Sequence, residues 1–109
     1  MAITSTQSKV PADVNNVAIG RYIDTGTVAA FKITTGFQPR YVRVVNQTSG
    51  DEYEWFEGMT AAHAIKRVAA GSQAATTSLG ITVAADGFTV GLDLDINVTS
   101  EQLSWIAIG

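Results

Sequence analysis

The sequence predicts an all-β protein, a single β-sandwich or jelly-roll-like domain with a flexible N-terminal arm. Two observations predict this fold class. Short segments in which apolar and polar residues alternate recur along the chain, and turns rich in Gly, Asp and Asn separate them at regular spacing, which argues against βαβ units. The chain of 109 residues has the size of one domain, which we assign to residues 17–109 after an arm at residues 1–16.

The arm and the first strand differ clearly in pattern. Residues 1–16 mix Thr, Ser, Gln and Asn with isolated apolar residues, so they have no face to bury. We expect this arm to be flexible or to become ordered on a partner. Residues 17–23, VAIGRYI, alternate instead and predict a strand, and a Gly-containing turn at residues 24–26 ends it.

The next predicted strands lead into a hairpin. VAAFKIT at residues 28–34 and RYVRVVN at residues 40–46 are the second and third strands, and Pro39, which cannot donate to a ladder, lies just before the third. A turn cluster at residues 46–51 leads into EYEWFEG at residues 52–58, in which aromatic and acidic residues alternate. The two segments predict the clearest hairpin of the chain.

Residues 59–78 fit two patterns. Three apolar residues recur at helical spacing, whereas AIKRVA at residues 64–69 also alternates with period two. With Thr60 as an N-cap and Gly71 as a stop, we expect one or two helical turns within a long connection. The small polar residues that follow end in a Thr-rich stretch that can form a strand. The residues at helical spacing are Ala62, Ile65 and Val68.

The C-terminal third returns to strand patterns. ITVA at residues 81–84 and FTVGLDLDINV at residues 88–98 flank a turn at residues 85–87, and QLSWIAIG at residues 102–109 follows a turn at residues 99–101. The last strand is apolar on both faces, so we expect it to be central in a sheet or covered by another subunit. One face carries Leu103, Trp105 and Ala107, and the other carries Ile106 and Ile108.

Composition and charge exclude several classes of partner. Only 16% of the residues are charged against an ordinary value of about 25%, which suits a surface that meets other copies or another protein. The net charge is −3 and the basic residues are scattered, so nucleic acid is not an expected partner. No apolar run approaches the roughly 20 residues of a membrane span, the N-terminal residues lack the charged-then-apolar pattern of a secretory signal, and no cysteine offers a disulfide or a thiolate metal site.

Residues that could carry catalysis are sparse. His63 is the only histidine, and no Gly-x-Ser-x-Gly pattern accompanies it, so we expect a surface histidine rather than a catalytic base. The carboxylates near the predicted hairpin fit a solvated strand face better than a hydrolase pair. We therefore predict that the chain is not an enzyme and takes no cofactor. These carboxylates are Asp51, Glu52, Glu54 and Glu57.

The segment GLDLDIN has an alternation that could hold a calcium ion. As a strand it places Asp93, Asp95 and Asn97 on one face, and Asp86 could join them. Calcium sites usually gather their ligands from a tight loop, however, and an amphipathic strand with a polar outer face explains the same pattern. We therefore predict no metal site.

Aromatic residues gather near the hairpin and in the last strand. They could form a platform on which a sugar ring stacks, but Trp and Tyr more often pack in cores and protein interfaces. We favour packing in the core or at an interface with another protein. The predicted interface residues are Tyr53, Trp55, Phe56, Trp105, Ile106 and Ile108.

Seven short motifs follow one another from the third strand to the C-terminal strand. They are YVRVVN at 41–46, EWFEGM at 54–59, AIK at 64–66, GIT at 80–82, DGFTVG at 86–91, DINV at 95–98 and WIA at 105–107. In this order they resemble the small virion structural proteins of tailed bacteriophages and prophages, of the head decoration or cement type. The resemblance covers residues 17–109 and leaves the arm unmatched.

The resemblance implies a non-catalytic role in the virion. Such a protein binds the outer surface of the assembled head, where it stabilises the junctions between capsomers. Its partners would be the major capsid protein and further copies of itself, with a homotrimer favoured over a dimer, and it would be made in the cytoplasm of the host bacterium. The motifs are structural, so no active-site residue is carried over from the family.

A second resemblance gives the alternative function. A β-sandwich of this size that ends on a Trp-containing strand is similar to the H-type lectins, which form trimers. That resemblance implies a carbohydrate-binding or receptor-binding virion module. Tyr53 and Trp55 would then contact the glycan.

Overall fold

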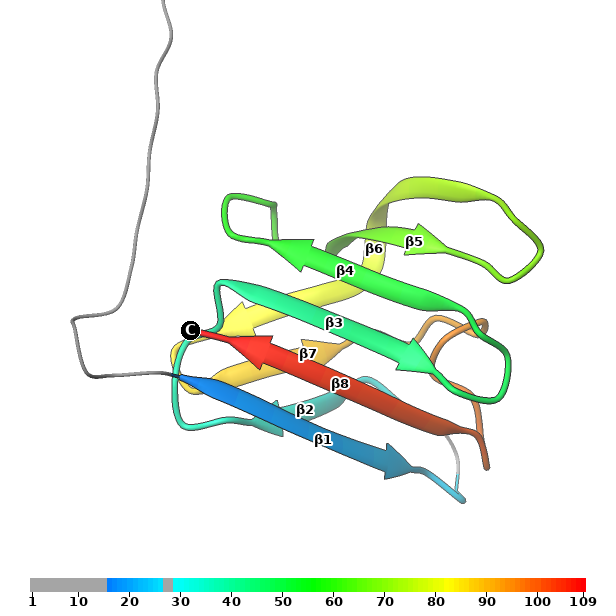
Figure 1. The fold of residues 1–109 in the computed structure, drawn as a ribbon, viewed down its shortest axis with the longest axis horizontal. Helices are drawn as coiled ribbons and strands as arrows, with labels where there is room; N and C mark the ends of the chain where they lie inside the picture. The colour runs from blue at the N-terminus through cyan, green and yellow to red at the C-terminus, as the bar shows by residue number, and fades with distance from the viewer. Residues whose placement is uncertain (1–15, 27–28) are drawn as a thin grey trace, which may run out of the picture.

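A computed structural model shows an all-β chain whose strands form one curled antiparallel sheet (Figure 1). The structure describes residues 16–26 and 29–109, and within these ranges it contains eight strands and no helix. The all-β prediction is confirmed, while the arm predicted for residues 1–16 lies outside the described residues except for Asn16. The strands are β1 (Val17–Ile23), β2 (Phe31–Thr34), β3 (Tyr41–Asn46), β4 (Glu52–Phe56), β5 (His63–Arg67), β6 (Gln73–Ala84), β7 (Gly87–Val90) and β8 (Gln102–Ile108).

The strands follow the order β1-β8-β3-β4-β5-β6-β7-β2 across the sheet. In Figure 1, β4, β3, β8 and β1 form the front half, and β6, β7 and β2 lie behind them. The long strand β6 joins the halves, because its first part pairs with β5 and its second part with β7. A bulge between His63 and Ala64 shifts the β5–β6 register, and Leu79 adopts a φ of 59° in the part of β6 that this shift skips.

The core fills the space between the two halves of the curled sheet. From the front half, β3, β4 and β8 turn every second side chain inward, as the period of a strand requires. The back half contributes residues of β2, β6 and β7, and Ile96 enters from the loop after β7. The fully buried apolar residues are Val42, Val44, Tyr53, Ala64, Ile81, Phe88, Val90, Ile96, Leu103 and Ala107.

Strand β8 lies between β1 and β3, which confirms the central position predicted from its two apolar faces. On the inner face, the Trp105 ring meets Phe88 edge-on with centroids 5.5 Å apart. The same indole lies directly against Gly20 of β1, where an added Cβ would be 2.5 Å from a Trp105 ring carbon. Glycine is therefore required at this point because the indole occupies the space of a side chain.

The open side of the curled sheet is closed by side chains and loops. The rings of Tyr22 in β1 and Phe31 in β2 stack with centroids 4.4 Å apart, so the two edge strands meet through an aromatic pair. Nearby, the Ser100 amide donates to the Asp24 carbonyl at 2.7 Å. The ring contact brings the two edge strands near each other without strand pairing between them, whereas the Ser100–Asp24 bond links the end of β1 to the turn before β8.

The predicted β3–β4 hairpin is confirmed. Val42 pairs with Trp55 and Val44 pairs with Tyr53, so the two strands share one inward face. In the turn, the Asn46 side-chain oxygen accepts hydrogen bonds from the Thr48 and Ser49 amides at 2.9 and 3.0 Å. This local capping satisfies turn donors that no strand can reach.

The helical turns predicted within residues 59–78 are wrong. Residues 63–67 form strand β5, in which Lys66 pairs with Tyr53 of β4. The period-two reading of AIKRVA prevails because β4 and β6 offer hydrogen-bonding partners on both sides. Gly71, with a φ of 107°, lies in the turn after β5. The strand expected from the Thr-rich stretch is confirmed, since β6 begins at Gln73.

The strand predicted for residues 88–98 is wrong beyond Val90, where β7 ends. The chain turns instead, with the Ile96 and Asn97 amides donating to the Asp93 carbonyl and the Asp95 amide donating to the Asp93 carboxylate. Such local hydrogen bonds compete with a ladder. The loop brings Ile96 and Asn97 into the interior, where burial outweighs the alternating pattern.

Gly20→Ala should destabilise the fold by about 1–3 kcal/mol, because the new methyl group overlaps the Trp105 indole. Equilibrium denaturation measures this cost, and in a Trp105→Phe background it should fall because the smaller ring leaves more room. Gly26→Ala is the matched control, since its Cβ would meet only an Asp24 oxygen at 3.6 Å. An equal cost in both backgrounds would contradict this packing.

Candidate interaction surface

The outer face of the front half of the sheet divides into an apolar part and a charged part. We call the apolar part the apolar patch, and define it as Val17, Ile19, Tyr41, Phe56, Ile106 and Ile108. Its members are direct cross-strand neighbours, since Ile19 pairs with Ile106 and Val17 with Ile108. Tyr41 extends the row of Val17 and Ile108 across the sheet, because it pairs with Ile108 on one side and with Phe56 on the other.

The apolar patch is open to solvent in the single chain. Ile19 is 75% exposed, Val17 54% and Phe56 49%. Isolated exposed apolar residues are common on proteins, but a contiguous group over four strands is a feature of interaction sites. Within the described residues, the patch is therefore a surface suited to contact with another protein.

The charged part of the same face is an ion-pair network on β3, β4 and β5. Glu52 accepts from Arg43 at 2.6 Å and from Arg67 at 3.2 Å, and Arg67 also reaches Glu54 at 2.9 Å. The Tyr41 hydroxyl donates to Glu54 at 2.6 Å, and this bond, ahead of the arginines, lowers the pKa of Glu54. Burial and the same bond raise the pKa of Tyr41 to about 12. These groups satisfy one another at the border of the apolar patch.

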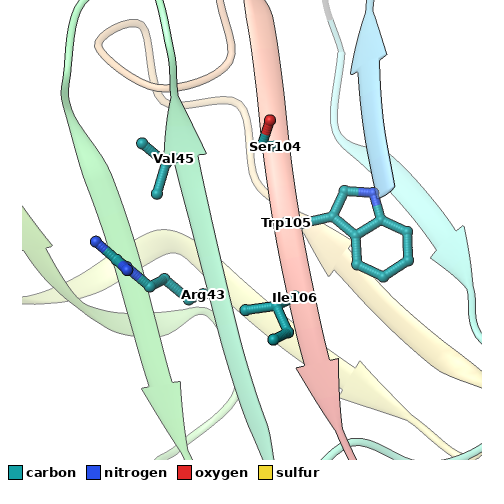
Figure 2. Close-up of a pocket in the computed structure, with 5 residues that line it drawn as sticks. All are labelled: Arg43, Val45, Ser104, Trp105 and Ile106. Atoms are coloured by element: carbon teal, nitrogen blue, oxygen red, sulfur yellow. The ribbon is translucent and has the colours of Figure 1, made fainter. Parts of the chain in front are cut away.

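A shallow hollow lies on the outer face between β3 and β8 (Figure 2). Its volume is about 170 Å³, and the small side chain of Ser104 leaves room for it between larger neighbours. In Figure 2 the Trp105 indole extends away from Ser104 and Ile106, as alternation along β8 requires. The residues that line the hollow are Arg43, Val45, Ser104, Trp105 and Ile106.

The structure divides the six residues predicted for the interface between two faces. Phe56, Ile106 and Ile108 lie in the apolar patch on the outer face. The other three point to the interior: Tyr53 is 0% exposed, Trp55 is 7% exposed, and the Trp105 ring packs on Phe88. The side chains of these three residues therefore serve the core of this chain, and the six do not form one site.

Reasoning centred on aromatic residues misses Val17, Ile19 and the contribution of Tyr41 to the patch. The sequence does contain a signal for the first two, because residues 17–23 alternate with apolar residues on the face opposite Tyr22. An amphipathic strand normally presents polar residues to water. An edge strand with apolar residues on its solvent face therefore indicates a surface that another molecule covers.

A polar cluster on the inner face of β4 and β5 binds the loop that follows β7. Lys66 donates to both Asp93 oxygens at 3.0 and 2.9 Å and to Asp95 at 2.7 Å, while the Tyr53 hydroxyl donates to Asp93 at 2.6 Å. Burial acts to raise the pKa of Asp93, but the hydrogen bonds from Tyr53 and Lys66 outweigh it and lower the pKa. Burial also raises the pKa of the Tyr53 hydroxyl, and its bond to Asp93 adds to the effect.

The structure does not bring the carboxylates of GLDLDIN together with Asp86 as calcium ligands. Asp93 and Asp95 are occupied by Lys66, and Asp86 forms an ion pair with Lys32 at 2.9 Å in another part of the sheet. In the part of the chain that the structure describes, no three His, Cys, Asp or Glu side chains are grouped to hold a metal ion. The Asp93 cluster is a structural contact between a loop and the sheet.

His63 lies in β5, beside the bulge, and is half-buried. Across residues 16–26 and 29–109 no helix is long and apolar enough to span a membrane.

Comparison of the chain with protein-family models, with curated proteins and with solved structures found no match. The residues and the geometry of the outer face are therefore the basis for assigning a function.

Asp93→Asn should destabilise the protein by about 1–3 kcal/mol, because Lys66 and Tyr53 lose a charged acceptor in a partly buried site. Asp95→Asn is the matched control. Its side chain is 57% exposed, so its loss should cost less than about 1 kcal/mol. Urea denaturation measures both variants, and equal costs would contradict the role given to Asp93.

Stability should fall as the pH rises above about 10, the ordinary pKa of tyrosine. The folded pKa of Tyr53 is raised, so the unfolded chain loses this proton first, and the stabilisation is complete below the unfolded pKa and lost on approach to the folded one. Tyr53→Phe should show a smaller fall between pH 9 and pH 11 than the parent protein. Identical slopes of unfolding free energy against pH would refute the assignment.

Proposed function

We propose that this chain is a phage capsid decoration, or cement, protein that binds the outer surface of the assembled head and stabilises capsomer junctions. The observation that carries the proposal is the apolar patch, which lies on the regular outer face of a sheet rather than in a pocket. An open apolar face of this kind suits a protein–protein interface. The proposal is non-catalytic and involves no cofactor.

The partners proposed are the major capsid protein and further copies of this chain. A decoration protein meets its site many times over a lattice, so weak contacts add up through multivalency. A small number of charged residues and a net charge of −3 support protein partners rather than nucleic acid. The protein would be made in the host cytoplasm and would reside on the outside of the virion head.

The finer fold proposed is a jelly-roll-like sandwich. In a rolled hairpin the first strand pairs with the last and the second with the last but one. The pairs β1·β8 and β2·β7 follow this rule, and β4·β5 is the innermost pair. The pairing of β3 with β4 and β8 departs from it, because the front and back halves remain one continuous sheet.

The position of the aromatic residues gives no support to the carbohydrate-binding alternative. Tyr53 and Trp55, the residues expected to contact a glycan, point into the core, and Tyr53 uses its hydroxyl on Asp93. A ring buried in the core presents no face to a sugar. The decoration role is therefore the one function proposed.

A variant without residues 1–15 should keep its fold and bind assembled heads more weakly. The fold is expected to survive because the eight strands and the core cluster all lie within residues 17–109. Binding is measured by co-sedimentation with shells assembled from a major capsid protein of a tailed phage. The arm would lose entropy on ordering but contact a large surface.

The parent protein should sediment with the shells until binding saturates, with a fixed number of bound chains per capsomer junction. Circular dichroism of the truncated variant controls for folding. A folded parent protein that stays in the supernatant at all shell concentrations would rule out the proposed function. A truncated variant that binds as tightly as the parent would remove the arm from the interface while leaving the decoration role.

A further inference from the structure

The outer face carries both a projecting side chain and a hollow within the same small area. Ile19 in β1 is 75% exposed and is the most exposed member of the apolar patch. The hollow over Ser104 lies on the neighbouring strand β8. In the register of these strands Ser104 pairs with Arg21, two residues along from Ile19 on the same face. The projection and the hollow are therefore diagonal neighbours.

A surface with its own projection and its own hollow is self-complementary under a two-fold rotation. An isologous interface needs this property, because each copy offers the same residues to the other. The hollow of about 170 Å³ is large enough for the side chain of one isoleucine, and Val45 and Ile106 give it apolar walls. A second copy of this chain therefore fits the patch without any further partner.

We propose that this face is an interface between two copies of the chain, packed sheet against sheet, with Ile19 of each copy in the Ser104 hollow of the other. This inference deepens the proposed function by naming one partner of the apolar patch, and it proposes a two-fold dimer in place of the homotrimer that the resemblance implies. It relies on the decoration role only for where the dimer acts. Two sheets that pack face to face interdigitate their side chains in this manner.

The area of the patch is sufficient for such a dimer. The exposed surface of its members is on the order of 500 Å² per copy. Full coverage of this surface in both copies would bury about 1,000 Å² in total. That total reaches the lower bound for a specific protein interface. Extension over the charged border would add to it.

The charges on the face are compatible with a two-fold pairing. Arg43 borders the hollow, but its guanidinium is already bound to Glu52 at 2.6 Å, so the pair brings little net charge to the interface. Arg21 lies on the edge strand, where its long side chain can extend to solvent at the rim. No member of the apolar patch is charged, so no like charges meet at its centre.

The first experiment measures the mass of the full chain by sedimentation equilibrium over a range of concentrations. The parent protein should reach twice the 11.5 kDa of one chain. Ile19→Asp should shift the dissociation constant at least 100-fold toward monomer, while its outward position leaves the fold intact, as circular dichroism would show. Leu94→Asp is the matched control, since Leu94 is 76% exposed on the loop after β7.

The second experiment tests the geometry, using a chain that has no cysteine of its own. The single variants Ile19→Cys and Ser104→Cys are mixed and oxidised. A disulfide-linked dimer should form efficiently in the mixture and only slowly with either variant alone, because each chain then carries a single cysteine and the two substituted positions can meet only between chains. A Leu94→Cys and Ser104→Cys mixture should give no more product than the single variants.

Several outcomes would overturn the inference: a monomer at all concentrations, a trimer, a dimer that Ile19→Asp leaves unchanged, or a dimer without the mixed cross-link. The last result would indicate pairing through the free edge of β1 instead. None of these outcomes depends on capsid shells. A monomer that still co-sediments with shells would remove the dimer and keep the decoration role, whereas a dimer that never binds shells would do the reverse.

Discussion

The rest of the structure depends on the position of β8 (Gln102–Ile108) between β1 and β3. On its inner face, Trp105 packs against Phe88 of β7, and this contact sets how closely the front half approaches the back half. The same indole lies against Gly20 of the neighbouring strand β1. The outer face of β8 carries Ile106 and Ile108, which the same alternation directs away from the core. One curled sheet can bury only one of its two faces. The apolar outer face of β8 and β1 is therefore exposed in the single chain.

Period-two alternation is sufficient to predict most of the front half of the sheet, because each of those strands has one buried and one outer face. Alternation fails to predict the structure where contacts with residues far away in the sequence determine the local conformation. His63–Arg67 fits a short helix as well as a strand, and its pairing with β4 and β6 settles the matter. GLDLDIN alternates as well as any strand, but Lys66 neutralises Asp93 and the buried Asn97 donates to the Ala29 carbonyl, so the chain turns. Neither contact is visible from local sequence.

The candidate site could be predicted only in part. Sequence alternation separates Tyr53 and Trp55 from Phe56, but it does not say which side faces the core. The hollow depends on a small residue, Ser104, having Val45 and Ile106 as neighbours, and the first of these comes from another strand. The strand order must therefore be known before Ile19 and the Ser104 hollow can be placed on the same face. The apolar outer residues of β1 were the available signal, because few strands expose such residues without a partner.

The central claim is that the apolar outer face of β1 and β8 is covered by another molecule when the protein performs its function. Methyl NMR with a soluble paramagnetic agent tests this most directly, because it reports the solvent contact of each side chain. The account predicts that the Ile19 and Ile106 methyl groups are shielded at high protein concentration and become accessible on dilution, while Leu94 stays accessible throughout. If the Ile19 methyl groups are as accessible as those of Leu94 at every concentration and in the presence of capsid shells, the account is contradicted.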